Sequence, residues 1–319
     1  MRTRGEVFED SGVDEWGVAP GMNAALRAAA QEVFSRGWEV LAVEEGYYGL
    51  LEGEIRPVDR AELWGYVQLG GTVLVTGRSS DFEEKEEGKE RAMEVLRDAG
   101  AEGLVVIGGG GSLSGGLALD KLGLPTVGVP ATIDNDIPGT DLSIGVDTAL
   151  NTATTVIIRI KDTATAHRRA IVVEVLGRDS GFLVVMSAIA GGTDAVMVPE
   201  FETQPEKLLE LLNESYDKGK PRFTVVAAKG ASPSAGEFRD FVNDAGGSYK
   251  ADLTVLGHIQ SSGSSTSFDR VLADGDSGKL VGLCGDEICR IPLGEVVDGQ
   301  RPLDPDLYKL AGVLSALPE

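Results

Sequence analysis

The feature that most constrains this chain is residues 104–147, where two strand-and-loop units follow each other directly. The first unit is an apolar run, LVVI (104–107), which enters four glycines and leaves through a serine into a helical pattern. Glycines let a backbone approach an anion closely, and the free amides at a helix start favour phosphate. We therefore predict a phosphate-binding loop formed by Gly108, Gly109, Gly110, Gly111 and Ser112.

The second unit is a short strand, 126–129, followed by a turn with two carboxylates. The turn reads Thr132-Ile133-Asp134-Asn135-Asp136 and is closed by a proline and a glycine. A glycine loop alone is often only a flexible turn, and an Asp pair alone is often only a hydrogen-bonded turn. Here both follow buried strands, and ligands collect at the carboxyl ends of parallel strands. The stretch as a whole predicts phosphate chemistry.

Beyond this stretch, strand-like and helix-like patterns alternate, as is typical of parallel sheets covered by helices. Helical spacing of apolar residues is found over 22–36, 83–98, 146–161, 180–190 and 205–218. Apolar β-type runs occupy 39–43, 72–76, 171–175, 195–198 and 223–228, with a weaker run at 6–8. We therefore predict an α/β fold with mostly parallel sheets.

The composition fits one large or two medium domains. The chain has 319 residues, and its hydrophobic fraction of 42% is ample for buried cores. It has no run of about 18 apolar residues and no signal-peptide core, so we expect a soluble, cytoplasmic protein. Cys284 and Cys289 are too few for a disulfide framework and are expected to be reduced thiols.

The charge balance excludes two classes of partner. A formal net charge of −22 and a pI near 4.5 make nucleic acid and anionic membrane surfaces poor partners, because both attract basic patches. An acidic surface also repels a phosphate ligand, so local arginines must overcome the overall field.

Other catalytic motifs are missing from the sequence, including GxxxxGK[ST] and GxSxG, and two distant histidines argue against zinc hydrolysis.

Seven segments resemble the phosphofructokinases that phosphorylate fructose 6-phosphate, in the family's order over nearly the whole chain. They are APGMNAALR (19–27), GGT with a downstream arginine (70–78), GGGGS (108–112), PATIDNDIPGTDLSIGVDTALNTA (130–153), EVLGRDSGFL (174–183), GHIQ (257–260) and SFDRVLA (267–273). The resemblance implies two Rossmann-like, three-layer α/β/α domains. It implies a nucleotide-binding domain at 1–145 plus about 269–300, and a sugar-phosphate and effector domain at 146–268 plus about 301–319.

The resemblance also implies a reaction, in which ATP phosphorylates the 1-hydroxyl of fructose 6-phosphate in glycolysis with Mg²⁺ as cofactor. Asp134 would be the general base, Asp136 would orient it or bind Mg²⁺, and Thr132 would touch the acceptor or the transferred phosphate. Arg178 would stabilise the transferred group. The nucleotide's phosphates would be met by Gly17, Arg78 and the glycine loop.

A subunit-shared site is implied as well, so we expect a homo-oligomer, either a tetramer or a dimer. One arginine of the sugar-phosphate clamp would reach in from a neighbouring subunit. The expected substrate-binding residues are Arg169, Leu176, Gly177, Lys229 and His258. The family's separate effector pocket, for a nucleotide or phosphoenolpyruvate, is matched in part by Arg27, Lys161, Asp194, Lys218 and Lys220.

Several ligand positions depart from the family's pattern. The usual Gly-Gly-Asp before APGMNA is Trp16-Gly17-Val18, and the metal-binding Asp of the glycine loop is Gly110, which predicts weaker metal binding. An acidic residue that contacts the sugar is replaced by Lys229. Two clamp arginines are replaced by Asp252 and Ser261, and each lost charge-assisted bond costs about 1.5–3 kcal/mol.

These departures leave two alternatives to an ATP-dependent phosphofructokinase. One is a catalytically impaired paralogue that acts as a binding or regulatory protein; the other is a kinase of a different sugar phosphate. The donor is better defined, because relatives that use pyrophosphate tend to carry Asp and Lys where this chain has Gly111 and Ala131. ATP is therefore favoured. After Ala273 the chain is also shorter than its relatives, which carry a helix there.

Overall fold

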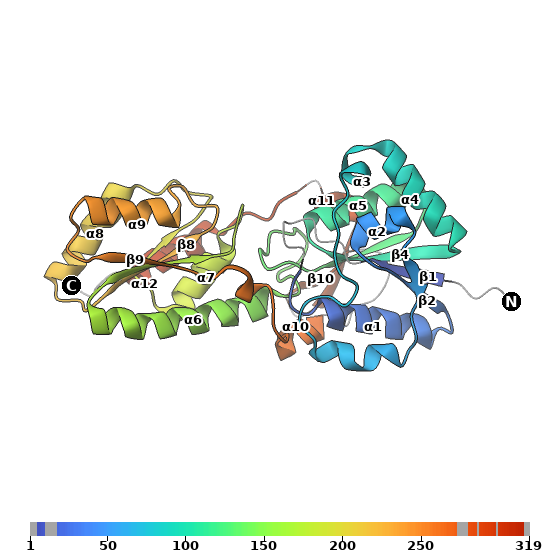
Figure 1. Cartoon of the computed structure of the whole chain (residues 1–319), viewed down its shortest axis with the longest axis horizontal. Helices are drawn as coiled ribbons and strands as arrows, with labels where there is room; N and C mark the ends of the chain where they lie inside the picture. Colours follow the sequence, from blue (N-terminus) through green and yellow to red (C-terminus); the bar gives the residue numbers. More distant parts are fainter. Residues whose placement is uncertain (1–4, 10–17, 273–279, 286, 298, 316–319) are drawn as a thin grey trace. The chain divides into compact units, whose positions relative to one another are not determined.

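The computed structural model describes residues 5–9, 18–272, 280–285, 287–297 and 299–315. Its contacts divide the chain into two compact units (Figure 1). The first unit comprises Met1–Thr148 and Ser261–Arg301, and the second comprises Ala149–Gln260 and Pro302–Glu319. Each unit is built on a sheet whose strands are mostly or wholly parallel, so the predicted α/β class is confirmed.

The first unit contains a five-stranded sheet of order β3-β2-β1-β4-β5. All neighbouring strands run parallel except β3, which is antiparallel to β2. The apolar run LVVI lies within β4 and is buried on both faces, as expected for an interior parallel strand. The strands are β1 (Gly5–Glu9), β2 (Glu39–Val43), β3 (Ile55–Pro57), β4 (Ala101–Gly108) and β5 (Thr126–Pro130).

Helices cover both faces of this sheet. Figure 1 shows α1 on one side and α2, α4 and α5 on the other. On the second side the core joins the stacked rings of Tyr47 and Phe82, 3.9 Å apart, to Leu96 and Val106. The elements are α1 (Met22–Ser35), α2 (Gly46–Glu52), the 3₁₀ helix η1 (Glu62–Gln68), α3 (Ser80–Glu84), α4 (Glu86–Asp98) and α5 (Gly110–Lys121).

The first unit is completed by a later part of the chain, which includes an antiparallel hairpin. This part comprises α10 (Ser267–Leu272), β10 (Leu280–Cys284), β11 (Glu287–Ile291) and α11 (Leu293–Val297). The hairpin brings the Cα atoms of Cys284 and Cys289 to 5.7 Å, and the two sulfurs form a disulfide. The expectation of reduced thiols is therefore wrong for this structure, because strand pairing places the two side chains within bonding reach.

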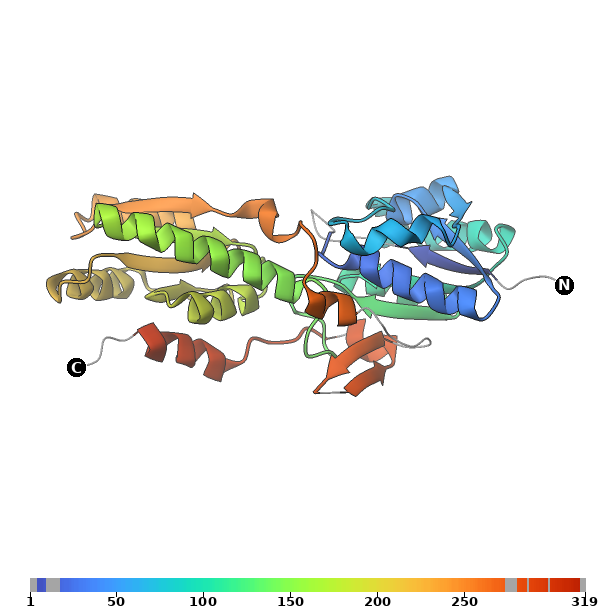
Figure 2. The same cartoon turned by 90° about the horizontal axis from the view of Figure 1, so that it is seen from below.

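The second unit contains a parallel sheet of order β7-β8-β6-β9. Its strand β8 is buried at all six positions. Figure 1 shows α8 and α9 on one face and α6 and α7 on the other, and Figure 2 brings α6 to the front. The elements are α6 (Val146–His167), β6 (Ala170–Val175), α7 (Phe182–Gly191), β7 (Ala195–Met197), α8 (Pro205–Asp217), β8 (Phe223–Ala228), α9 (Ala235–Asp244), β9 (Ala251–Val255), η2 (Gly257–Gln260) and α12 (Pro305–Ser315).

Two predicted elements differ from the structure. The segment 72–76 is a loop rather than a strand. The Asn23 side chain accepts from the Val73 N–H and donates to the carbonyl of Gly71, just before the segment. The helix predicted over 83–98 is two helices, α3 and α4, with Lys85 in extended conformation between them. At Gly88, a Cβ would lie 2.1 Å from the carbonyl oxygen of Asp81, so a glycine permits this close approach.

The long helix α6 begins on a buried carboxylate. Asp269, in α10, accepts hydrogen bonds from the backbone amides of Gly145 and Thr148, both at 2.9 Å, and from the Thr148 hydroxyl. Burial raises the pKa of the Asp269 carboxyl, and these hydrogen bonds oppose that shift.

In the part of the chain that the structure describes, no helix is long and apolar enough to span a membrane.

Candidate phosphoryl-transfer site

The glycine loop and the acidic turn meet where β4 and β5 end. Gly108 pairs with Pro130 in the parallel register, and the Ala131 amide donates to the Gly108 carbonyl at 2.9 Å. A Cβ at Gly109 would lie 3.8 Å from the Cβ of Thr132. The two segments predicted to carry phosphate chemistry are therefore in contact.

The glycine loop leads directly into α5. Gly109 is the residue before the helix, so the amides of Gly110, Gly111 and Ser112 lie in the first turn, where no earlier carbonyl can accept from them. Gly110 is exposed, whereas the side chain of Ser112 is completely buried. The whole Ser112 residue is inaccessible, and its carbonyl accepts a hydrogen bond from the Tyr47 hydroxyl at 2.7 Å.

The acidic turn is shaped by a residue that sequence reasoning missed. Asn135 lies between the two aspartates, is buried, and has a left-handed φ of 52°. Its side chain donates to the Asp141 carbonyl at 3.1 Å and accepts from the Ser143 amide at 3.0 Å. Asn is one of the few residues that adopt this conformation readily, which was the available sequence signal. Asp134 and Asp136, on either side, remain partly exposed.

Arg78 lies on the surface of the same unit in an ion pair. Its Nε and Nη2 donate to the carboxylate oxygens of Glu83 at 3.3 and 3.1 Å. A nucleotide phosphate would compete with this carboxylate for the guanidinium. The other expected nucleotide contact, Gly17, lies outside the described residues, as does Trp16.

The second unit gathers four of its expected ligand residues at the carboxyl edge of its sheet. Gly177 and Arg178 follow β6, Lys229 follows β8, and His258 lies in η2 after β9. The Gly230 amide donates to the Gly177 carbonyl at 3.0 Å, and this bond joins the loop after β8 to the loop after β6. Arg178, Lys229 and His258 are all exposed.

The segment after β9 is joined to the loop after β6 by a residue that sequence reasoning also missed. Gln260 is completely buried, and its amide oxygen accepts from the backbone N–H of Leu176 at 3.3 Å. Its amide nitrogen donates to the Gly257 carbonyl at 3.0 Å. In the GHIQ motif, the glutamine therefore holds two loops together. Nearby, burial raises the pKa of the Glu174 carboxyl, while the positive charge of Lys229 opposes that shift.

Arg169 lies at the opposite edge of this sheet. It precedes β6, whereas Arg178 follows it, and six strand residues span about 20 Å. Its Nη1 donates to the carboxylate of Asp252, which lies one strand away in β9. Within one chain, the structure does not bring Arg169 together with Arg178, Lys229 or His258.

Comparison with known proteins shows to which family the chain belongs. The phosphofructokinase family model matches residues 13–282. The chain belongs to the phosphofructokinase family. It is 41% identical over 311 residues to the ATP-dependent 6-phosphofructokinase of Shouchella clausii, covering 94% of this chain and 97% of that protein. It is 40% identical over 312 residues to the protein of the same name from Thermotoga neapolitana, with the same coverage.

Solved phosphofructokinases share the fold. The Saccharomyces cerevisiae structure matches 93% of this chain with a TM-score of 0.82 and 32% identity. The Pichia pastoris structure in the T-state matches 98% with a TM-score of 0.85 and 29% identity. This chain spans 45% and 36% of those two longer chains. The predicted phosphofructokinase fold is confirmed.

The residues expected to bind an effector are only partly gathered. Lys220 pairs with Asp194 at 2.8 Å, and Lys161 donates to the carbonyls of Gly191 and Gly192, both at 2.7 Å. Burial and the neighbouring Arg222 lower the pKa of Lys161. Lys218 lies on the exposed end of α8, 3.9 Å from Glu214. Arg27 belongs to α1 in the other unit.

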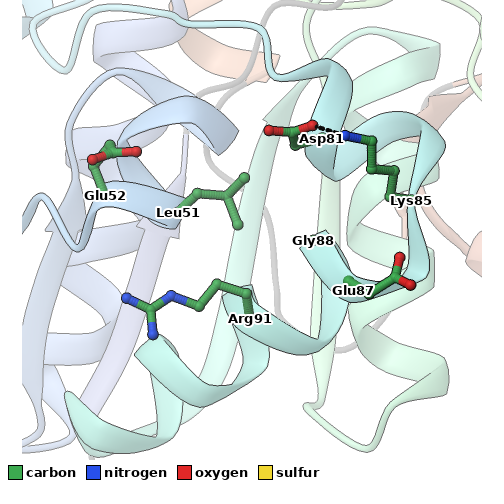
Figure 3. Close-up of a pocket in the computed structure, with 7 residues that line it drawn as sticks. All are labelled: Leu51, Glu52, Asp81, Lys85, Glu87, Gly88 and Arg91. Carbon is green, nitrogen blue, oxygen red and sulfur yellow. Dashed lines mark hydrogen bonds and ion pairs between the residues drawn. The ribbon is translucent and has the colours of Figure 1, made fainter.

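A separate cavity of about 510 Å³ lies between α2 and the α3–α4 pair (Figure 3). Figure 3 shows Asp81 and Lys85 directed toward each other in an ion pair. This cavity includes none of the predicted ligand residues. It is lined by Leu51, Glu52, Asp81, Lys85, Glu87, Gly88 and Arg91.

The packing of the Arg178 loop predicts the effect of a methyl group at Gly230. A Cβ there would lie 1.7 Å from the carbonyl oxygen of Arg178, so Gly230→Ala must displace that backbone. We expect a loss of about 1–3 kcal/mol in the free energy of unfolding, measured by urea denaturation. The control is Gly236→Ala in α9, where a Cβ meets nothing within 4 Å. Equal stabilities of the two variants would contradict the described loop contact.

Proposed function

We propose that this chain transfers the γ-phosphoryl group of ATP to the 1-hydroxyl of fructose 6-phosphate, giving fructose 1,6-bisphosphate. The observation that carries the proposal is the contact between the glycine loop and the acidic turn at the ends of β4 and β5. It occurs in a chain about 40% identical, over 94% of its length, to bacterial enzymes named for this reaction.

In the proposed mechanism, Asp134 accepts the proton of the sugar hydroxyl as that oxygen attacks phosphorus. A positioned base contributes about 10²–10⁴-fold in rate. The Asp134 amide donates to Thr132 Oγ1 at 3.3 Å, so this threonine is held beside the base, where it would contact the transferred group. Most of the remaining rate enhancement comes from positioning and charge stabilisation, since phosphoryl transfer needs little covalent chemistry from the protein.

The phosphates are held by backbone amides and by arginines. The glycine loop presents first-turn amides of α5, where the helix dipole favours an anion. Arg78 exchanges its pair with Glu83 for a nucleotide phosphate, and Arg178 stabilises the transferred group. Gly17 is a further proposed nucleotide contact.

The residues present fit Mg²⁺ only as an ion carried by the nucleotide. Among the residues that the structure describes, no group of three or more His, Cys, Asp or Glu side chains is placed to hold a metal. Mg²⁺ needs only one or two carboxylates when phosphates supply further oxygens, and Asp136 can provide one. The bound ion would neutralise phosphate charge.

The acceptor is bound by the loops of the second unit. Leu176, Gly177, Lys229 and His258 line the proposed sugar-phosphate site. Because Arg169 lies at the opposite edge of the same sheet, it would serve the site of another subunit, which supports a homo-oligomer of two or four chains. Nucleotide or phosphoenolpyruvate control through Lys161, Asp194 and Lys220 is part of the proposal, as is a cytoplasmic location.

A kinase of a different sugar phosphate is the second candidate. It is favoured by the Arg169–Asp252 pair, which neutralises a clamp arginine, and by Lys229 beside Glu174. The alternative of an impaired paralogue predicts no turnover with fructose 6-phosphate or with any other sugar phosphate. Activity assays with a panel of phosphorylated ketoses and aldoses separate the three candidate functions.

The central test is Asp134→Asn, which keeps the shape of the side chain but removes the base. We expect kcat for MgATP and fructose 6-phosphate to fall by about 10²–10⁴-fold. Asp98→Asn, an exposed position at the end of α4, should leave kcat unchanged. Formation of fructose 1,6-bisphosphate is measured in a coupled assay. Full turnover by Asp134→Asn would rule out its role as base.

A second prediction concerns the metal. A Cβ at Gly110 would lie 3.7 Å from Ile137 Cδ1, an ordinary contact, and the position is exposed, so a side chain can be added there. Gly110→Asp should lower the Mg²⁺ concentration required for half-maximal velocity by about tenfold, the effect of one charge-assisted interaction. Gly110→Asn provides the neutral control of the same size. Equal Mg²⁺ dependence of the two variants would place the metal elsewhere.

A third prediction concerns the Arg169–Asp252 pair. Asp252→Asn should free the guanidinium and lower KM for fructose 6-phosphate by about tenfold, with kcat unchanged. Adding Arg169→Ala to that variant should remove the gain. Asp306→Asn, which breaks the exposed Lys309–Asp306 pair, is the control. A KM that does not respond to Asp252→Asn would show that Arg169 does not bind the acceptor.

A further inference from the structure

One arginine, distant in sequence from the acidic turn, bonds to a carbonyl of that turn and to two carbonyls just after it. The backbone N–H of Arg301 donates to the Asp136 carbonyl at 2.8 Å. Its guanidinium Nη1 donates to the Thr140 carbonyl at 2.8 Å and also to the Asp141 carbonyl. These bonds join positions more than 150 residues apart, and no sequence motif marked Arg301.

The contacts close the turn into a ring. Arg301 joins Asp136 to the 140–141 peptide, and the Asn135 side chain donates to the same Asp141 carbonyl at 3.1 Å. The Asp141 carbonyl therefore receives donors from both Asn135 and Arg301. Since Asn135 lies between Asp134 and Asp136, the ring fixes the backbone that carries both carboxylates.

The chemistry of the contact suits arginine. A guanidinium always carries its charge and presents several donors in a fixed plane, so it can bond to successive carbonyls. Arg301 is half-buried, which reduces competition from water. It is also the last residue of the first unit, so the chain is anchored to the acidic turn immediately before it enters the second unit.

We propose that Arg301 is a positioning residue for phosphoryl transfer, which holds the Asp134–Asp136 turn in its reactive geometry through the Asp136, Thr140 and Asp141 carbonyls. The inference rests on the proposed function, because it acts through Asp134. Arg301 itself needs no contact with either substrate. Its loss should therefore change kcat and not KM.

The test uses the full-length chain with Arg301→Ala, Arg301→Lys and Arg301→Gln. Arg301→Ala should lower kcat by about 10²-fold, the cost of a displacement near 1 Å, with KM for ATP and fructose 6-phosphate within about twofold. Arg301→Lys retains charge and several donors, so it should recover most of kcat. Arg301→Gln, a neutral donor, should be intermediate. Arg36→Ala, an exposed arginine of the same unit paired with Glu32, is the matched control.

A double-mutant comparison separates the two hypotheses. If Arg301 acts through Asp134, Arg301→Ala should lower kcat no further in an Asp134→Asn background. Full activity of Asp134→Asn would refute the proposed base, whatever Arg301 does. An unchanged kcat in Arg301→Ala, with Asp134→Asn inactive, would overturn the positioning role alone. Additive losses of kcat in the double mutant would likewise overturn it. So would a loss of kcat in Arg301→Ala that comes with raised KM values or lowered thermal stability and that Arg301→Lys does not restore.

Discussion

The site depends on the parallel register between β4 and β5. Because Gly108 pairs with Pro130, both strands end at the same level, and the glycine loop and acidic turn leave the sheet together. A parallel sheet aligns the carboxyl ends of its strands, so residues more than twenty positions apart can face one ligand. A one-residue slip would move every side chain of β5 to the other face and separate the two loops.

Charge neutralisation within the chain is a second theme. The formal net charge is −22, and two of the cations expected to bind phosphate lie in ion pairs: Arg78 pairs with Glu83 and Arg169 with Asp252. An exposed ion pair contributes little to stability. Such a pair can therefore be exchanged for another partner at small cost. The Arg169–Asp252 pair differs in that both partners are anchored at adjacent strands.

Sequence patterns predicted most of the fold, and they failed where contacts form only between folded segments. The strands near 39–43, 171–175 and 223–228 were found because continuous apolar runs mark buried parallel strands. The run 72–76 has the same character, yet it forms a loop in which the Val73 N–H donates to the side chain of Asn23. The disulfide was missed because only the pairing of β10 with β11 brings Cys284 to Cys289.

For the candidate site, the sequence by itself determined which residues could carry phosphate chemistry, because the free backbone of glycine, the carboxyl group of aspartate and the guanidinium of arginine are set by residue type. Only the tertiary structure decided how they are held. Asn135, Gln260 and Arg301 act through backbone carbonyls and amides, and every residue offers those groups. A hydrogen bond to a backbone carbonyl does not require a particular residue type at the contacted position. The sequence therefore does not identify such partners, and only the folded structure shows them.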